Sequence, residues 1–310
     1  MESLPSDPLL EYNDDTFKSL RKQYNFEKKE DMDAAIDVFE EWLTKQNHFT
    51  KKEYPRKYLE ITLISLKGSV ERAKTQMDRL CTLKTILARF FDISDPIVEY
   101  RCFKGKFQQA LLPRLTKEHH RIYVSRFQCN GLDADFYFKT LKCATAICEY
   151  IKLHDYNDGF IAIADFHAIN IVSFLSEVNI SDLRQMVTLI MEGYQMRVKA
   201  IHLVTESTTI DLLVKLFKQL FSQKIGQRIH THKSIDTLYD YVPREILPSD
   251  FGGEEKSLEE LFDHTLEVLG SEENMQDLME MRRATVVEKM RPKGFEDYGM
   301  IGTFRSLSVD

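Results

Sequence analysis

Short apolar runs that alternate with longer helical segments constrain the fold of this chain most strongly. The run at residues 121–127 alternates with a period of two and is rich in β-branched and aromatic residues, which is typical of a strand. The run at 160–164 is continuously apolar, as expected for a strand covered on both faces. Further strands are predicted at 198–204 and 228–231, and helices at 133–153, 181–193 and 208–224. Strands separated by helices predict a largely parallel sheet with crossover helices.

The N-terminal third has a different pattern and reads as helical throughout. One buried helix face is indicated by apolar residues at three-to-four-residue spacing, namely Ala34, Ala35, Val38, Phe39, Trp42 and Leu43. A second stripe runs from Val70 to Phe91, and polar residues with a proline at 92–96 end it. We therefore expect an all-α N-terminal subdomain at residues 1–95, an α/β domain at 96–270 and a C-terminal tail at 271–310.

Charge and composition exclude several classes of protein. The chain has 310 residues and a formal net charge of -7, which argues against a dedicated nucleic-acid-binding protein. No apolar run is long enough to span a bilayer, and residues 1–15 show no signal-peptide pattern, so we expect a cytoplasmic protein. The 5 cysteines are scattered without a CxxC pair, which favours reduced thiols.

Residues that could support catalysis or metal binding do not form a known pattern. His202, His230 and His232 come from neighbouring predicted strands and could converge on a metal, but no metal-ligand spacing supports this. Structural histidines are the preferred interpretation. The sequence contains no GxSxG elbow, P-loop or dinucleotide-binding glycine motif. We therefore expect neither enzyme activity nor a cofactor.

The most specific motif lies at residues 246–254, with the sequence Ile-Leu-Pro-Ser-Asp-Phe-Gly-Gly-Glu. Pro248 fixes one backbone dihedral, and Gly252 and Gly253 can adopt conformations that other residues avoid. The motif follows the segment 201–206, an amphipathic helix and the segment 224–232. In this order it resembles the C-terminal half of the CRAL-TRIO (Sec14-like) lipid-binding domain.

Further segments extend the resemblance over residues 30–270. Gly159 to Asp165 resembles the central strand of that family, and Lys67 to Ala73 resembles the end of its N-terminal helical motif. Met290-Arg291-Pro292 and the segment 302–307 look like the ending of insect members related to tocopherol-transfer and retinaldehyde-binding proteins. The resemblance implies a CRAL-TRIO lipid-binding domain, with a mostly parallel sheet and a gate helix, preceded by an all-α subdomain.

The helix predicted at 208–224 corresponds to the gate in related proteins. Its apolar residues spread around more than one face, which is unusual for a surface helix. One interpretation is a helix buried on two sides. The other is a gate, with one face roofing a lipid cavity (Ile210, Val214, Phe217 and Phe221) and a second available to a membrane (Leu213 and Leu216).

The floor of such a pocket would come from the sheet and from the helix before the third strand. Phe160, Ala162 and Ala164 share one face of the central strand by alternation. Positions that match the cavity lining of tocopherol-transfer relatives are Met186, Leu189, Ile190, Tyr194, Val198, Ile201 and Leu203. Each of these residues taken alone favours ordinary core, whereas the set as a whole favours a cavity.

A local basic excess accompanies the gate helix. From Arg197 to Lys233 there are 7 basic and 2 acidic residues, an excess of 5 in an acidic protein. Within it Arg197, Lys199, Lys224 and Arg228 match a phosphoinositide-binding cluster of the relatives, which implies contact with an anionic membrane surface. A solvated basic edge is the alternative. Asp236 occupies the place of a lysine that helps Sec14-type exchangers hold phosphatidylinositol, which disfavours phosphatidylinositol exchange.

Two functions remain after these considerations, and a third, an enzyme that acts on a lipid, has no catalytic motif to support it. The first is a carrier that binds one tocopherol-, retinoid- or carotenoid-like molecule and transfers it between membranes. The second is a non-enzymatic regulatory module with a collapsed cavity, which binds phosphoinositide or a protein partner. A measured apolar cavity large enough for a drug-sized ligand would favour the first.

Overall fold

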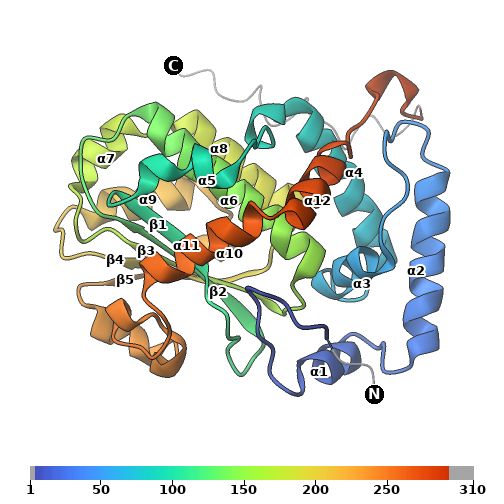
Figure 1. The fold of residues 1–310 in the computed structure, drawn as a ribbon, viewed down its shortest axis with the longest axis horizontal. Helices are drawn as coiled ribbons and strands as arrows, with labels where there is room; N and C mark the ends of the chain where they lie inside the picture. Colours follow the sequence, from blue (N-terminus) through green and yellow to red (C-terminus); the bar gives the residue numbers. More distant parts are fainter. Residues whose placement is uncertain (1–3, 293–310) are drawn as a thin grey trace.

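Four helices form the N-terminal region of the chain, whose computed structural model describes residues 4–292. They are α1 (Thr16–Gln23), α2 (Lys29–Thr44), α3 (Arg56–Ser65) and α4 (Val70–Ile86). Their apolar stripes meet in one buried cluster that includes Phe39, Leu63 and Met77. In Figure 1 these helices gather at one end of the molecule, to the right of the sheet. The helical nature of this region was predicted correctly, whereas the domain limits stay predictions.

A five-stranded sheet follows, and it confirms the predicted α/β class. Its strands are β1 (Phe107–Leu111), β2 (His120–Phe127), β3 (Gly159–Asp165), β4 (Val198–Val204) and β5 (Ile229–His232), in the order β1-β2-β3-β4-β5. The pairs from β2 to β5 are parallel, and β1 adds an antiparallel edge. The edge strand β1 was not predicted.

Helices connect the strands and cover the sheet. They are α5 (Pro96–Glu99), α6 (Ala134–His154), α7 (Ile171–Glu177), α8 (Ile180–Thr188), α9 (Ile210–Leu220), α10 (Gln223–Gly226), α11 (Leu258–Leu269) and α12 (Glu272–Arg282). One π-turn at Leu189–Gly193 extends α8. Polar caps begin several of them: Asp133 accepts a hydrogen bond from the Phe136 amide, and Ser257 forms a capping box with Glu260.

The two faces of the sheet pack against different segments. The face that carries Ile122, Ile163 and Val204 is covered by the segment 235–258. The opposite face, which carries Ile201 and Leu203, meets α6, α7, α9 and α11. Residues on each strand therefore alternate between two separate cores, as the period of a strand requires.

The Leu-Pro-x-x-Phe-Gly-Gly motif shapes the segment that covers the first of these faces. Gly252 has a φ of 73°, and a side chain at Gly253 would lie 1.9 Å from the Leu247 carbonyl oxygen. Phe251 is fully buried in the core of this face. The two glycines therefore permit the tight turn that inserts Phe251.

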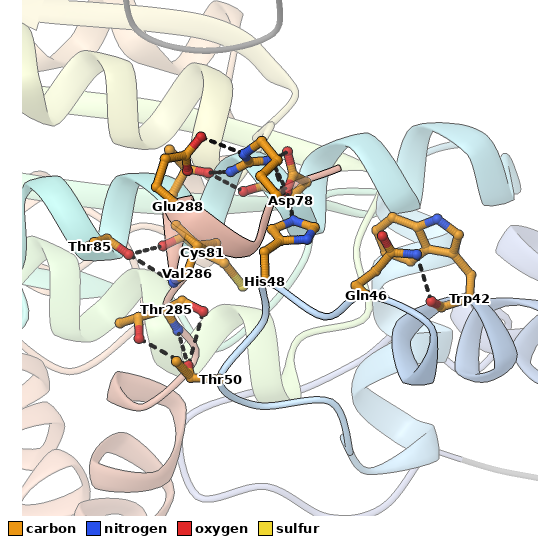
Figure 2. Close-up of polar contacts among 12 residues, drawn as sticks. Trp42, Gln46, His48, Thr50, Asp78, Cys81, Thr85, Thr285, Val286 and Glu288 are labelled. Atoms are coloured by element: carbon orange, nitrogen blue, oxygen red, sulfur yellow. Dashed lines mark hydrogen bonds and ion pairs between the residues drawn. The ribbon is translucent and has the colours of Figure 1, made fainter. Parts of the chain in front are cut away.

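After α12, residues 285–291 form a strap that crosses the N-terminal helices (Figure 2). Phe49 and Val286 form an antiparallel bridge, and the Val287 amide donates to the His48 carbonyl oxygen at 2.7 Å. The Val286 amide also donates to Thr85 Oγ1 on α4 at 2.9 Å. The C-terminal segment and the N-terminal helices thus form one packed unit.

Candidate functional site

Helix α9 carries the most unusual distribution of apolar side chains in the domain. Leu213 alone among its residues is fully buried, whereas Ile210, Val214 and Phe217 are half-buried against the core beneath the helix. Leu212 is 47 % exposed. The helix packs chiefly against α7 and α10. The apolar face of α9 therefore lies over the core of the domain, and part of that face stays exposed to solvent.

The structure alters two details of the predicted gate helix. Leu213, expected on the membrane-facing side, has no exposed surface in this conformation, and Leu216 is half-buried. The outward apolar residue is Leu212. The predicted helix at 208–224 is also interrupted, because Phe221 has an extended backbone with ψ 160°. The break involves a single residue. Polar residues such as Lys215 and Lys218 alternate with the apolar ones, so the periodicity of the sequence does not reveal it.

Beneath α9 lies a strand surface with small side chains. Ala162 and Ala164 of β3 point toward the same core as Ile201 and Leu203 of β4. Nine of the predicted pocket residues meet in this cluster: Ala162, Ala164, Val198, Ile201, Leu203, Ile210, Val214, Phe217 and Phe221. Ala162 and Ala164 thus share one face of β3, and their role in a pocket stays a prediction.

The other predicted pocket residues lie elsewhere. Met186, Leu189, Ile190 and Tyr194 pack with Leu80 and Phe90 from the N-terminal region. Phe160 joins a third cluster around Tyr150. The π-turn at Leu189–Gly193 directs this segment toward α4, and no sequence signal indicated that turn. The predicted pocket residues thus fall into three clusters, and most of them lie under α9.

Two residues of the predicted basic cluster bind one carboxylate that the sequence did not indicate. Lys199 Nζ lies 2.7 Å from Asp158 Oδ2, and Arg197 Nη1 lies 3.0 Å from Oδ1. Tyr24 also donates to Asp158, and the His120 ring lies 3.8 Å from it. The sequence around Asp158, Asn157-Asp158-Gly159, indicates only a turn.

These contacts determine the ionisation of Asp158. Burial opposes its charge, but hydrogen bonds from His120, Lys199 and Tyr24 and the charge of Arg197 outweigh that effect. The pKa of Asp158 therefore lies well below its usual range. Three cationic or potentially cationic groups surround one carboxylate, so the site keeps a positive excess.

The remaining two basic residues are placed differently. Arg228 donates through Nη1 to the Val198 carbonyl oxygen, which brings it to the beginning of β4 near Arg197 and Lys199. Lys224 lies on α10 with an exposed side chain. Arg197, Lys199 and Arg228 thus come together at the amino ends of β3 and β4, and Lys224 extends the basic surface toward α9.

The three histidines noted in the sequence lie close together, and they contact one another. His202 Nδ1 and His232 Nε2 are 2.9 Å apart, and the His230 ring stacks on His202 at 5.1 Å. Burial, followed by the nearby His232 and His230, lowers the pKa of His202 to about 3. Within residues 4–292 no group of three or more His, Cys, Asp or Glu side chains is arranged to hold a metal ion.

No helix in the described part of the chain is both long and apolar enough to cross a bilayer.

Comparisons with known proteins were made for the whole chain. A solved structure titled "Crystal structure of Sfh5" is similar over 87% of this chain and 100% of that chain, with 10% identity and a TM-score of 0.39. The alpha-tocopherol transfer protein-like proteins of Mus musculus and Homo sapiens are each 27% identical over 97 residues. These residues are 31% of this chain, and the match spans only 28% of each relative.

A family model supplies the longest assignment. The model of the CRAL/TRIO domain matches residues 109–253 and so ends at the second glycine of the Leu-Pro-x-x-Phe-Gly-Gly motif. It includes the strands β2 to β5 and helix α9. The chain therefore contains a CRAL/TRIO domain at residues 109–253.

Proposed function

We propose that this protein is a non-enzymatic carrier that binds one hydrophobic small molecule between α9 and the sheet and transfers it between membranes. The preferred ligands are tocopherol-, retinoid- or carotenoid-like. Arg197, Lys199, Lys224 and Arg228 would contact phosphoinositide in an anionic membrane, reversibly and from the cytoplasm. The names of the alpha-tocopherol transfer protein-like relatives support this class of ligand.

The observation that carries the proposal is the incomplete burial of the apolar face of α9. Ile210, Val214 and Phe217 stay half-buried above a strand whose facing residues include Ala162 and Ala164. Removing apolar surface from water is worth about 25 cal/mol per Å². An apolar ligand beneath the helix, or an acyl-chain region against it, would therefore be stabilised by covering these side chains.

The placement of α9 also suits an opening motion. Its principal partners are the short helices α7 and α10, and an extended residue, Phe221, separates it from α10. Swinging the helix outward would withdraw one fully buried side chain, Leu213, from the core. Exposing one such leucine costs about 1.5–3 kcal/mol. Burial of Leu212, Leu213 and Leu216 in a membrane would offset a cost of this size.

Two residues of the basic cluster are paired with Asp158, and this pairing indicates how a phosphate would bind. Asp158 already orients Arg197 and Lys199, so their side chains are held before a ligand arrives. A phosphate carries more charge and more acceptor oxygens than one carboxylate. It would add contacts to Arg228 and Lys224 that Asp158 does not make.

Organic extraction and native mass spectrometry of the purified chain test the proposal directly. We expect one bound lipid per chain, or stoichiometric uptake of a tocopherol, retinoid or carotenoid offered in solution. A chain that takes up none of these, yet still binds phosphoinositide vesicles, would contradict the carrier proposal and favour the regulatory module.

A further inference from the structure

Lys152 is a buried lysine without a carboxylate partner. It lies near the C-terminal end of α6, and the residue is only 6% exposed. Its Nζ atom bonds to Thr62 Oγ1 at 2.8 Å and to Gln76 Oε1 at 3.2 Å. No ion pair joins it to an acidic side chain within residues 4–292.

The two oxygen partners can only accept hydrogen bonds from Lys152. The Thr62 hydroxyl donates its own hydrogen to the Tyr58 carbonyl oxygen at 2.7 Å. The Gln76 amide nitrogen donates to the Gly193 carbonyl oxygen at 2.6 Å. A neutral amine has two N–H donors and one lone pair, so these two bonds use its hydrogens and leave the lone pair unoccupied.

Burial favours this neutral form, and the two charged groups that act on Lys152 work in opposite directions. Glu149, one turn earlier on α6, is already held by Lys84 at 2.6 Å and by the Tyr194 hydroxyl. Burial lowers the pKa of Lys152 to about 7, Glu149 opposes the shift and Lys84 adds to it. Asp155 lies on the next turn, but Arg121 binds both of its carboxylate oxygens at 2.9 Å.

Lys152 also lines a cavity. Its walls include the apolar side chains of Ile61, Ile151, Phe160 and Met196, and Arg197 lies at its border. The cavity volume is ≈ 30 Å³. About 10–15 Å³ suffices for one water molecule, so there is room for about two waters or for an aldehyde as small as formaldehyde, and not for a whole lipid.

We propose that Lys152 is a reactive amine site that forms an imine with short-chain aldehydes. The Lys152 nitrogen lone pair attacks the carbonyl carbon, a C–N bond forms, and the carbonyl oxygen gains a proton to give a carbinolamine. Loss of that oxygen as water leaves a C=N bond, so that one amine and one aldehyde yield one imine and one water. The site is distinct from the apolar cluster under α9 and does not depend on the proposed carrier function.

Reductive trapping with formaldehyde and cyanoborohydride on the full-length chain tests the inference, with modified lysines mapped by peptide mass spectrometry. Lys139 is the internal control, because it lies on the same helix and pairs with Asp135 at 2.8 Å. At pH 7 a pKa near 7 leaves about half of an amine neutral, about 1000-fold more than for an ordinary lysine. Restricted access reduces this advantage, and we expect labelling of Lys152 to exceed that of Lys139 by at least about tenfold.

Two further readouts separate a reactive amine from a merely accessible one. Labelling of Lys152 should level off above about pH 8, whereas labelling of Lys139 should keep rising. Gln76→Glu should suppress labelling at Lys152 by about tenfold or more, since a carboxylate at that place holds the amine protonated. Circular dichroism of the variant checks its fold. Labelling of Lys152 no faster than Lys139, or only in urea, would overturn the inference, whatever the variant does.

Discussion

Arg291 holds both carboxylate oxygens of Asp78 through Nη1 at 2.7 Å, although 213 positions of sequence separate the two residues. The same guanidinium donates to Thr82 Oγ1 at 2.9 Å. His48 Nε2 approaches the same Oδ1 atom at 2.7 Å and lies 3.4 Å from Arg291 Nη1. One carboxylate on α4 therefore joins the loop before α3 to the strap at residues 285–291.

The first prediction concerns the contribution of this contact to stability. Arg291→Ala should lower the free energy of unfolding by about 2 kcal/mol, because it removes charge-assisted hydrogen bonds from a largely buried site. Urea denaturation measures the change. Arg282→Ala is the matched control: Arg282 pairs with Asp92 at 2.9 Å with both side chains about half exposed or more, so the loss should stay below about 1 kcal/mol. Equal losses in the two variants would contradict this assignment.

The second prediction concerns acid sensitivity at His202. An unfolded histidine takes up its proton near pH 6.5, whereas burial, His232 and His230 lower the pKa of His202 to about 3 in the folded chain. Between these values the unfolded chain binds a proton that the folded chain does not. The stability that His202 contributes is therefore complete above about pH 6.5 and is lost as the pH falls toward 3.

His202→Phe should flatten that dependence while keeping an aromatic ring in the stack. The difference in unfolding free energy between pH 7.5 and pH 5 should be smaller in the variant by about 2 kcal/mol. Urea unfolding at both pH values provides the measurement. Because both proteins are compared with themselves, a general loss of stability in the variant does not affect the result. An unchanged difference would show that His202 is not the titrating group.

The third prediction separates the inner and outer faces of α9. Phe217→Asp should abolish retention of a tocopherol- or retinoid-like ligand, since a charge directed into an apolar pocket costs several kcal/mol. Leu212→Asp places the same charge on an exposed position of the same helix and should leave retention in solution unchanged. Fluorescence titration or native mass spectrometry compares the two. If both variants retain ligand like the parent, Phe217 does not face the pocket.

The fourth prediction concerns the basic cluster. Neutralising Arg197, Lys199, Lys224 and Arg228 together should slow ligand transfer to phosphoinositide vesicles, because each cation near an anionic surface contributes about 1 kcal/mol. High salt should have the same effect on the parent, since it screens exposed charge. Ligand affinity in solution should stay nearly constant. Transfer rates to vesicles with and without phosphoinositide decide the matter.

Asp158→Asn gives a test in the opposite direction. This change removes the carboxylate that binds Arg197 and Lys199 while keeping the shape of the side chain. Vesicle binding should become tighter as two cations lose their internal partner. Unchanged binding would mean that these two residues do not meet the membrane, and weaker binding would mean that Asp158 acts by orienting them.

Local patterns in the sequence predicted the main elements for identifiable reasons. The strands β2, β3 and β4 are short apolar runs between turn signals, and their boundaries were predicted within one residue or so. The strand β1 escaped notice because Gln108 and Gln109 occupy its centre and its extended form depends on pairing with β2. Both glutamines are nevertheless buried, as an edge strand covered by α11 allows.

The periodicity of the sequence could not predict which side chains contact one another. Nothing near Asp158 in the sequence indicates that Arg197 and Lys199 will bind it, because that contact depends on the alignment of β3 with β4. Lys152 lies in a helix that reads as ordinary, and only tertiary packing removes it from water. The resemblance to the family supplied the position of α9, whereas the inward orientation of Leu213 required the structure.

The strap also sets an order of events during synthesis. Thr50 and Thr285 bond across a separation of 235 residues, and contacts between such distant segments form late because a long loop must close first. A ribosome delivers His48 and Asp78 long before Arg291. Until translation has passed Arg291, Asp78 therefore has His48 beside it but lacks its arginine partner, and α4 lacks the strap, a period in which a chaperone could bind the N-terminal helices.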